Sequence, residues 1–109
     1  MSRSLTLVNC IRQWFNPDEA VSKLRIAAAP YYDRGEISIE TGCNIVIPHR
    51  YAKVLKNYTH EEVMSAALKE IYASKKRVAS NERIVPIEYQ PPHFGGVGVL
   101  TLEMHMRAG

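Results

Sequence analysis

The chain has 109 residues, of which 46% are hydrophobic and 23% charged, with 14 basic and 11 acidic side chains. This length and composition are typical of one globular domain, and they exclude a second independent core and a wholly disordered chain. Proteins that bind the phosphate backbone usually carry a heavier or more concentrated positive charge, so a net charge of +3 decides nothing about a nucleic-acid partner.

Cysteine content and hydropathy bear on the compartment. Cys10 and Cys43 are too few for a disulfide-stabilised secreted scaffold of this length. The apolar run within residues 1–12 is too short and too polar for a signal peptide, and no stretch is long enough to span a bilayer. We therefore expect two free thiols in a cytoplasmic, reducing compartment, with no membrane contact and no cofactor.

Residues 4–15 carry two competing patterns. Their β-branched and aromatic content favours a strand, although Asn9 and Gln13 interrupt the alternation. The large apolar side chains also fall within one helical stripe, which favours a helix. We predict a strand over Ser4–Cys10, with the helix as the alternative. The stripe consists of Leu7, Val8, Ile11, Trp14 and Phe15.

A helix start follows at Asn16–Glu19. Asparagine is a good N-cap, proline suits the first helical position, and two acids face the positive end of the helix dipole. Val21 and Leu24 begin the apolar side of this helix. Because proline disfavours helical backbone at the residue before it, Pro30 predicts an end at or before Ala29.

A hairpin is predicted next. The segment Glu36–Glu40 alternates polar and apolar residues without a break, as a half-buried strand does. Thr41–Gly42 is expected to turn the chain, and Cys43–Ile47 to form the partner strand. Pro48 should end that strand.

Thr59 and Glu62 have the spacing of a capping box, which predicts a second helix from His60 onward. The cations at residues 75–77 are expected in its last turn, where they suit the negative end of the dipole. The apolar face of this helix consists of Met64, Ala67, Leu68 and Ile71.

Two more strands complete the predicted fold. Pro86 lies within the apolar segment Ile84–Ile87, which makes that strand an edge or a bulged strand. Residues 91–96 are rich in proline and glycine and predict a loop before the last strand. The resulting order, β-α-β-β-α-β-β, predicts an α+β two-layer sandwich, and its first six elements match the ferredoxin-like order.

The sequence gives little sign of catalysis or metal binding. Its cysteines and histidines lack the close pairing that zinc sites use. Cys43 precedes His49 by six residues, so a small enzyme with a Cys/His site stays as a weak alternative, although Cys43 also has an apolar setting. We assign no catalytic residue and no metal ligand.

Residues 50–83 contain the main regional charge bias, with eight cations against four acids. Tyrosines interleave with the cations, as stacking on single-stranded bases would require. We therefore hold a nucleic-acid-binding module as an alternative function, against the plainer explanation of a solvated helix face. The candidate nucleic-acid-binding residues are Arg50, Lys53, Lys56, Lys69, Tyr72, Lys76 and Arg77.

The last strand has one strongly apolar face. A long apolar strand needs a partner or a cover at its edge, and either subunit pairing or a central position in the sheet supplies one. The leading expectation is a small non-enzymatic interaction or assembly protein that acts as a homo-oligomer. One origin that this small, motif-poor chain would fit is an accessory protein of a virus or mobile element. The expected oligomer interface consists of Leu100, Leu102, Met104 and Met106.

Overall fold

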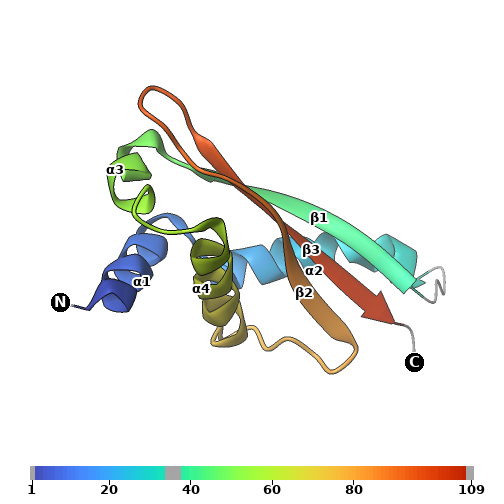
Figure 1. The fold of residues 1–109 in the computed structure, drawn as a ribbon. Coiled ribbons are helices and arrows are strands. Elements are labelled where there is room, and N and C mark those ends of the chain that lie inside the picture. Colours follow the sequence, from blue (N-terminus) through green and yellow to red (C-terminus); the bar gives the residue numbers. More distant parts are fainter. Residues whose placement is uncertain (1, 34–37, 108–109) are drawn as a thin grey trace.

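The computed structural model describes residues 2–33 and 38–107, and the side chains of all of these except 32, 33, 38–41 and 107 (Figure 1). Two helices come first, a strand and three helical segments follow, and two strands end the chain. The elements are α1 (Arg3–Trp14), α2 (Pro17–Asp33), β1 (Ser38–Ile47), the 3₁₀ turn η1 (His49–Tyr51), α3 (Ala52–Leu55), α4 (His60–Tyr72), β2 (Glu82–Gln90) and β3 (Gly98–Arg107).

The three strands form one antiparallel sheet in the order β1-β3-β2. Strand β3 is central and pairs with β1 without interruption, from Ser38 opposite Arg107 to Ile47 opposite Gly98. Helix α2 packs on β1 and β3, α4 packs on β2, and α1 packs on α4 and α3 (Figure 1). The predicted α+β class is therefore confirmed, whereas the predicted order is wrong: the observed order is α-α-β-α-α-β-β.

The core lies between the helices and one face of the sheet. The side chains at its centre have little or no exposed surface. They come from α1, α2, α3, α4 and all three strands. The opposite face of the sheet is open, and Val46 on it is 59% exposed. The largest fully buried side chains include Ile11, Leu24, Ile47, Leu55, Ile71, Ile84, Leu100, Leu102 and Met104.

The first segment is a helix, so the predicted strand over Ser4–Cys10 is wrong and the alternative is correct. The Ser2 hydroxyl caps α1 by accepting from the backbone N–H of Leu5 at 3.1 Å. Leu7 and Ile11 then meet the core one helical turn apart. Serine at the N-cap was the available signal, and the helix outweighs the weak strand propensity because Leu7, Ile11 and Phe15 of the apolar stripe are buried.

Helix α2 begins as predicted, with the Asn16 side chain accepting from the backbone N–H of Glu19 at 3.1 Å. Its predicted end at or before Ala29 is wrong, because the helix continues through Pro30 to Asp33. Proline removes the hydrogen bond to the carbonyl of Ile26, but Pro30 and Ile26 are both exposed. Water can therefore solvate the carbonyl that the proline leaves without its usual partner.

The predicted hairpin is one continuous strand. Gly42 pairs with Glu103 in the middle of β1, so the turn at Thr41–Gly42 is wrong. Residues 36 and 37 of the first predicted strand lie outside the described part of the chain. The apolar positions of Cys43–Ile47 continue the phase of Ile39, and β3 offers a backbone partner at every position. Pro48 ends the strand as predicted.

Helix α4 has the predicted capping box. The Thr59 hydroxyl accepts from the N–H of Glu62 at 3.1 Å, and the Glu62 carboxylate accepts from the N–H of Thr59 at 3.0 Å. The cations at 75–77 lie beyond the end of the helix, so their predicted place in its last turn is wrong. The Asp18 carboxylate accepts from the N–H of Lys75 at 3.1 Å, which holds this backbone outside the helix.

Strand β2 is an edge strand with a register shift between Pro86 and Glu88, as Pro86 predicts. The loop between β2 and β3 is also confirmed. Strand β3 lies between the other two strands, and it therefore has no free edge.

Candidate functional site

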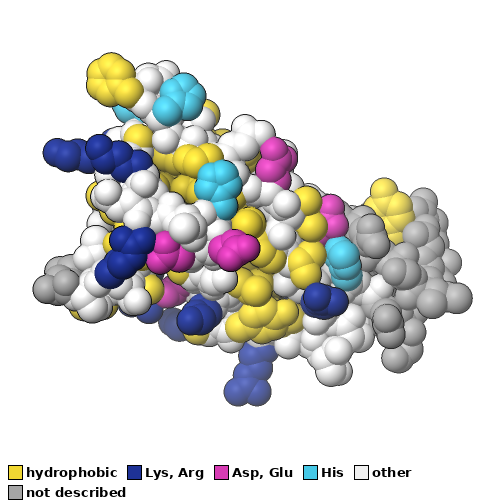
Figure 2. Space-filling view, viewed as in Figure 1, with side chains coloured by type: hydrophobic (Ala, Val, Ile, Leu, Met, Phe, Trp, Pro, Cys, Tyr) yellow, Lys and Arg dark blue, Asp and Glu magenta, His cyan; other side chains and the backbone are white. Residues whose placement is uncertain are grey.

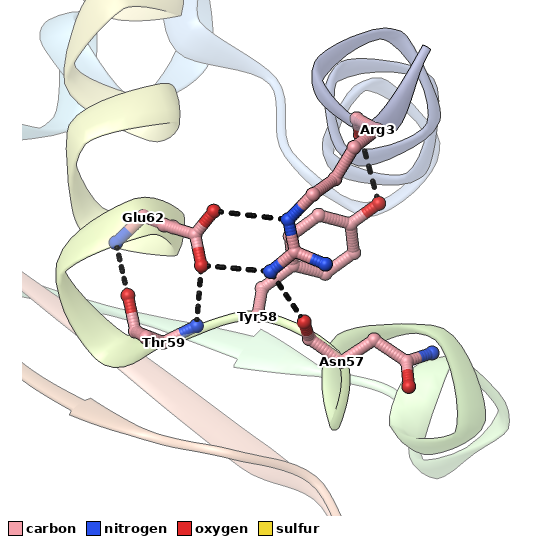
Figure 3. Close-up of polar contacts among 5 residues, drawn as sticks. All are labelled: Arg3, Asn57, Tyr58, Thr59 and Glu62. Atoms are coloured by element: carbon pink, nitrogen blue, oxygen red, sulfur yellow. Dashed lines mark hydrogen bonds and ion pairs between the residues drawn. The ribbon is translucent and has the colours of Figure 1, made fainter. Parts of the chain in front are cut away.

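Three hollows on the surface are candidates for function. The first has a volume of about 530 Å³ and lies between α1 and α4. A network of polar contacts closes one end of it (Figure 3). The Arg3 guanidinium donates to the Glu62 carboxylate at 2.9 Å and to the carbonyl of Asn57 at 2.6 Å, and it stacks 4.4 Å from the centre of the Tyr58 ring.

These contacts fasten α1 to the start of α4. The Arg3 side chain lowers the pKa of Glu62, which keeps that carboxylate charged. Further along the same hollow, Arg12 donates to Glu70 at 3.1 Å. Two ion pairs, Arg3–Glu62 and Arg12–Glu70, thus join α1 to α4 beside this hollow, and we interpret them as structural contacts.

The second hollow has a volume of about 330 Å³ and runs beside β1, next to the corner between α1 and α2. Cys43 lines it, and burial raises the pKa of this thiol. Burial also raises the pKa of Cys10. A nucleophilic cysteine needs a lowered pKa, so these environments do not favour the Cys/His enzyme. Both cysteines are free.

The third hollow has a volume of about 550 Å³ and lies between α3 and the tip of the β2–β3 hairpin. Basic and histidine side chains gather there around a hydrophobic projection (Figure 2). No aspartate or glutamate is among the described residues that line it. The lining consists of His49, Arg50, Ala52, Lys53, Lys56, Pro92, His93 and Phe94.

The hairpin tip has a specific backbone geometry. The N–H of His93 donates to the carbonyl of Gly96 at 3.0 Å, and the N–H of Gly96 donates to the carbonyl of His93 at 2.9 Å. Gly95 has a φ of 80°, which a type II turn requires at its third residue. A Cβ atom at Gly96 would lie 2.1 Å from the His93 ring. The turn places Phe94 at its tip, 101% exposed.

The structure divides the predicted nucleic-acid-binding residues into two groups. Arg50, Lys53 and Lys56 line the third hollow. The remaining four do not line it. Lys69 lies on the exposed side of α4 and Tyr72 at the C-terminal end of that helix, and residues 76 and 77 lie in the connection to β2.

The predicted interface residues lie in the core of the chain. Leu100, Leu102 and Met104 have no exposed surface, and Met106 is partly buried against them. The apolar face of the last strand is thus covered by helices of the same chain. A homo-oligomer would need another surface.

Within the described residues, no three histidine, cysteine or acidic side chains come together in a way that could hold a metal ion. No helix in the same part of the chain has the length and hydrophobicity needed to cross a membrane. Comparison with protein-family models, curated proteins and solved structures found no match for this chain.

The sequence interpretation missed five lining residues of the third hollow: His49, Ala52, Pro92, His93 and Phe94. Residues 91–96 were recognised as a loop, but not as a tight turn that presents an aromatic ring. The available signal was a phenylalanine directly before two glycines, because such a turn cannot bury its own tip.

Proposed function

We propose that this chain is a non-enzymatic interaction or assembly protein that acts as a homo-oligomer, with the free edge of β1 paired to β1 of a second copy. The observation that carries the proposal is the contrast between the two edges of the sheet. Free strand edges pair readily with other chains unless proline, charge or a bulge protects them.

The β2 edge has all three kinds of protection. It contains Pro86, a register shift beside it, and the exposed charged side chains of Arg83 and Glu88. Such an edge pairs poorly with another strand. It is therefore an unsuitable surface for strand addition.

The β1 edge lacks this protection. Its register with β3 is unbroken over ten residue pairs, and residues 41–47 contain neither a charge nor a proline. A twofold axis at Asn44 would place residues 41–47 of the two copies opposite each other, and none of these residues is charged. Antiparallel pairing around that axis would extend the three-stranded sheet of each copy into one continuous sheet.

Side chains beside this edge also favour β1 as the interface between two copies. The second hollow runs along β1 and offers space of about 330 Å³ for side chains of an added strand. Val46 lines it and is 59% exposed in the single chain. Pairing would cover part of this side chain, which favours association.

Light scattering coupled to size-exclusion chromatography tests the proposal. We expect a dimer for the unaltered chain and a monomer for Val46→Lys, because a lysine would protect the edge. Ile87→Lys is the matched control: it places the same charge on the β2 edge, where the isoleucine is 50% exposed, and should remain dimeric. A monomeric chain at high micromolar concentration would overturn the proposal, as would equal effects of the two variants when circular dichroism shows both folded.

A further inference from the structure

We infer that the third hollow is a binding site for single-stranded nucleic acid, with phosphates on Arg50, Lys53 and Lys56 and a base stacked on Phe94. The site combines three cations of the predicted set with an aromatic ring that the sequence interpretation did not include. It does not require pairing through β1, and the two proposals can be tested separately.

The first step concerns charge. None of these three cations forms an ion pair with a described carboxylate, and no acid lines the hollow. The Arg50 guanidinium lies 4.8 Å from the centre of the Tyr51 ring and donates to its hydroxyl at 3.1 Å, so it keeps donors for a ligand. Four other basic side chains are already paired: Arg3 with Glu62, Arg12 with Glu70, Lys23 with Glu19, and Arg25 with Glu82.

The second step concerns the aromatic ring. The turn geometry requires Gly95 and Gly96, but nothing in its hydrogen bonds requires a phenyl ring at residue 94. Leaving such a ring in water forgoes the free energy that its burial would supply. A base stacked on the ring would recover part of that free energy, and stacking tolerates any base.

The third step concerns the kind of ligand. A volume of about 550 Å³ is within the range of small-molecule pockets, and it suits an unstacked base with its sugar and phosphate. The bases of a duplex are stacked and would not reach the Phe94 ring. Cations around an aromatic platform are the pattern of single-strand binding, whereas an acidic peptide would use the cations and leave the ring unused.

Fluorescence anisotropy with a labelled twelve-residue oligothymidylate tests this inference over a range of salt concentrations. Three neutralised phosphates predict a slope of about −2 in the logarithm of affinity against the logarithm of salt, at roughly 0.7 per phosphate. The double variant Lys53→Glu/Lys56→Glu should bring the slope closer to zero and weaken the affinity. The matched control is Lys69→Glu/Lys76→Glu, which makes the same change of charge outside the hollow and should bind as the unaltered chain does.

Phe94→Ala separates stacking from charge. We expect a loss of affinity of about tenfold with an unchanged salt slope, because stacking contributes roughly 1–3 kcal/mol per base and involves no counterion. This variant should also keep the oligomeric state of the unaltered chain. Its result therefore does not depend on the proposed pairing through β1.

Several results would overturn the inference. They are the absence of binding at low salt, an equal effect of the two charge variants, and an unchanged affinity for Phe94→Ala. Competition by a polyglutamate of the same length, or by a duplex, as strong as competition by the oligothymidylate would also overturn it.

Discussion

The Tyr89 side chain is buried on the inner face of β2 and is 5% exposed. Its ring meets the His60 ring edge-on at 5.1 Å, and its hydroxyl has no hydrogen-bond partner among the described residues. Burial raises the pKa of Tyr89 to about 12, because the charged phenolate is poorly solvated there. An unpartnered buried hydroxyl costs about 1–3 kcal/mol of stability.

Tyr89→Phe should therefore raise the free energy of unfolding by about 1 kcal/mol, because it removes the unpartnered hydroxyl and keeps the ring. Because the pKa of Tyr89 is raised, the unaltered chain should lose stability as pH rises from about 10 towards 12. The variant has no phenol at this position and should not show this loss. Urea unfolding at neutral and high pH measures both effects. A variant less stable than the unaltered chain would show that the hydroxyl has a partner.

Helix α2 shows how one unfavourable residue is accommodated within an element. Val21, Leu24 and Ala28 have no exposed surface, and they fix the helix against the sheet. Pro30 lies two residues after Ala28, where the helix is exposed. Packing of the buried stripe thus stabilises the helix beyond the point where local propensity predicts its end.

Pro30→Ala should stabilise the chain by about 1–3 kcal/mol, because it restores a backbone hydrogen bond and removes a helix-breaking residue from an exposed position. Thermal unfolding followed by circular dichroism measures this change. Ala29→Gly, at a neighbouring exposed position, is the control and should destabilise by about 1 kcal/mol. If Pro30→Ala lowered the melting temperature, the proline would have a role that its helical position does not explain.

At the scale of the whole molecule, an ion pair between α2 and the start of β2 links the two layers. Arg25 donates to both carboxylate oxygens of Glu82, at 2.7 and 2.9 Å, and the N–H of Ala79 donates to the same carboxylate at 2.7 Å. The Glu82 side chain is 5% exposed. The hydrogen bond from Arg25 lowers the pKa of Glu82.

Because folding lowers the pKa of Glu82, the charged Arg25–Glu82 pair stabilises the chain fully above the ordinary glutamate pKa of about 4.3. This stabilisation is lost as the pH falls through the lowered pKa of the folded state. Glu82→Gln should cost about 2 kcal/mol at pH 7 and reduce the loss of stability on acidification. Urea unfolding between pH 7 and pH 3 measures both effects. Glu88→Gln, an exposed carboxylate on the same strand, should change neither.

The local signals in the sequence determined several features correctly. Asn16 and the Thr59–Glu62 box marked two helix starts, and Pro86 marked an edge strand with an irregular register. These features depend on residues a few positions apart, whose side chains bind neighbouring backbone or block it. The α+β class follows from the same local patterns.

Contacts between distant residues decided the rest. Strand β1 stays extended through Gly42 because β3, some sixty residues later, pairs along its whole length. Both edges of β3 are paired because the strand is central, and its apolar face is buried because helices of the same chain cover it, which no local pattern reveals. The third hollow likewise joins residues 49–56 to 92–94, and only the tertiary structure brings those cations and the Phe94 ring together.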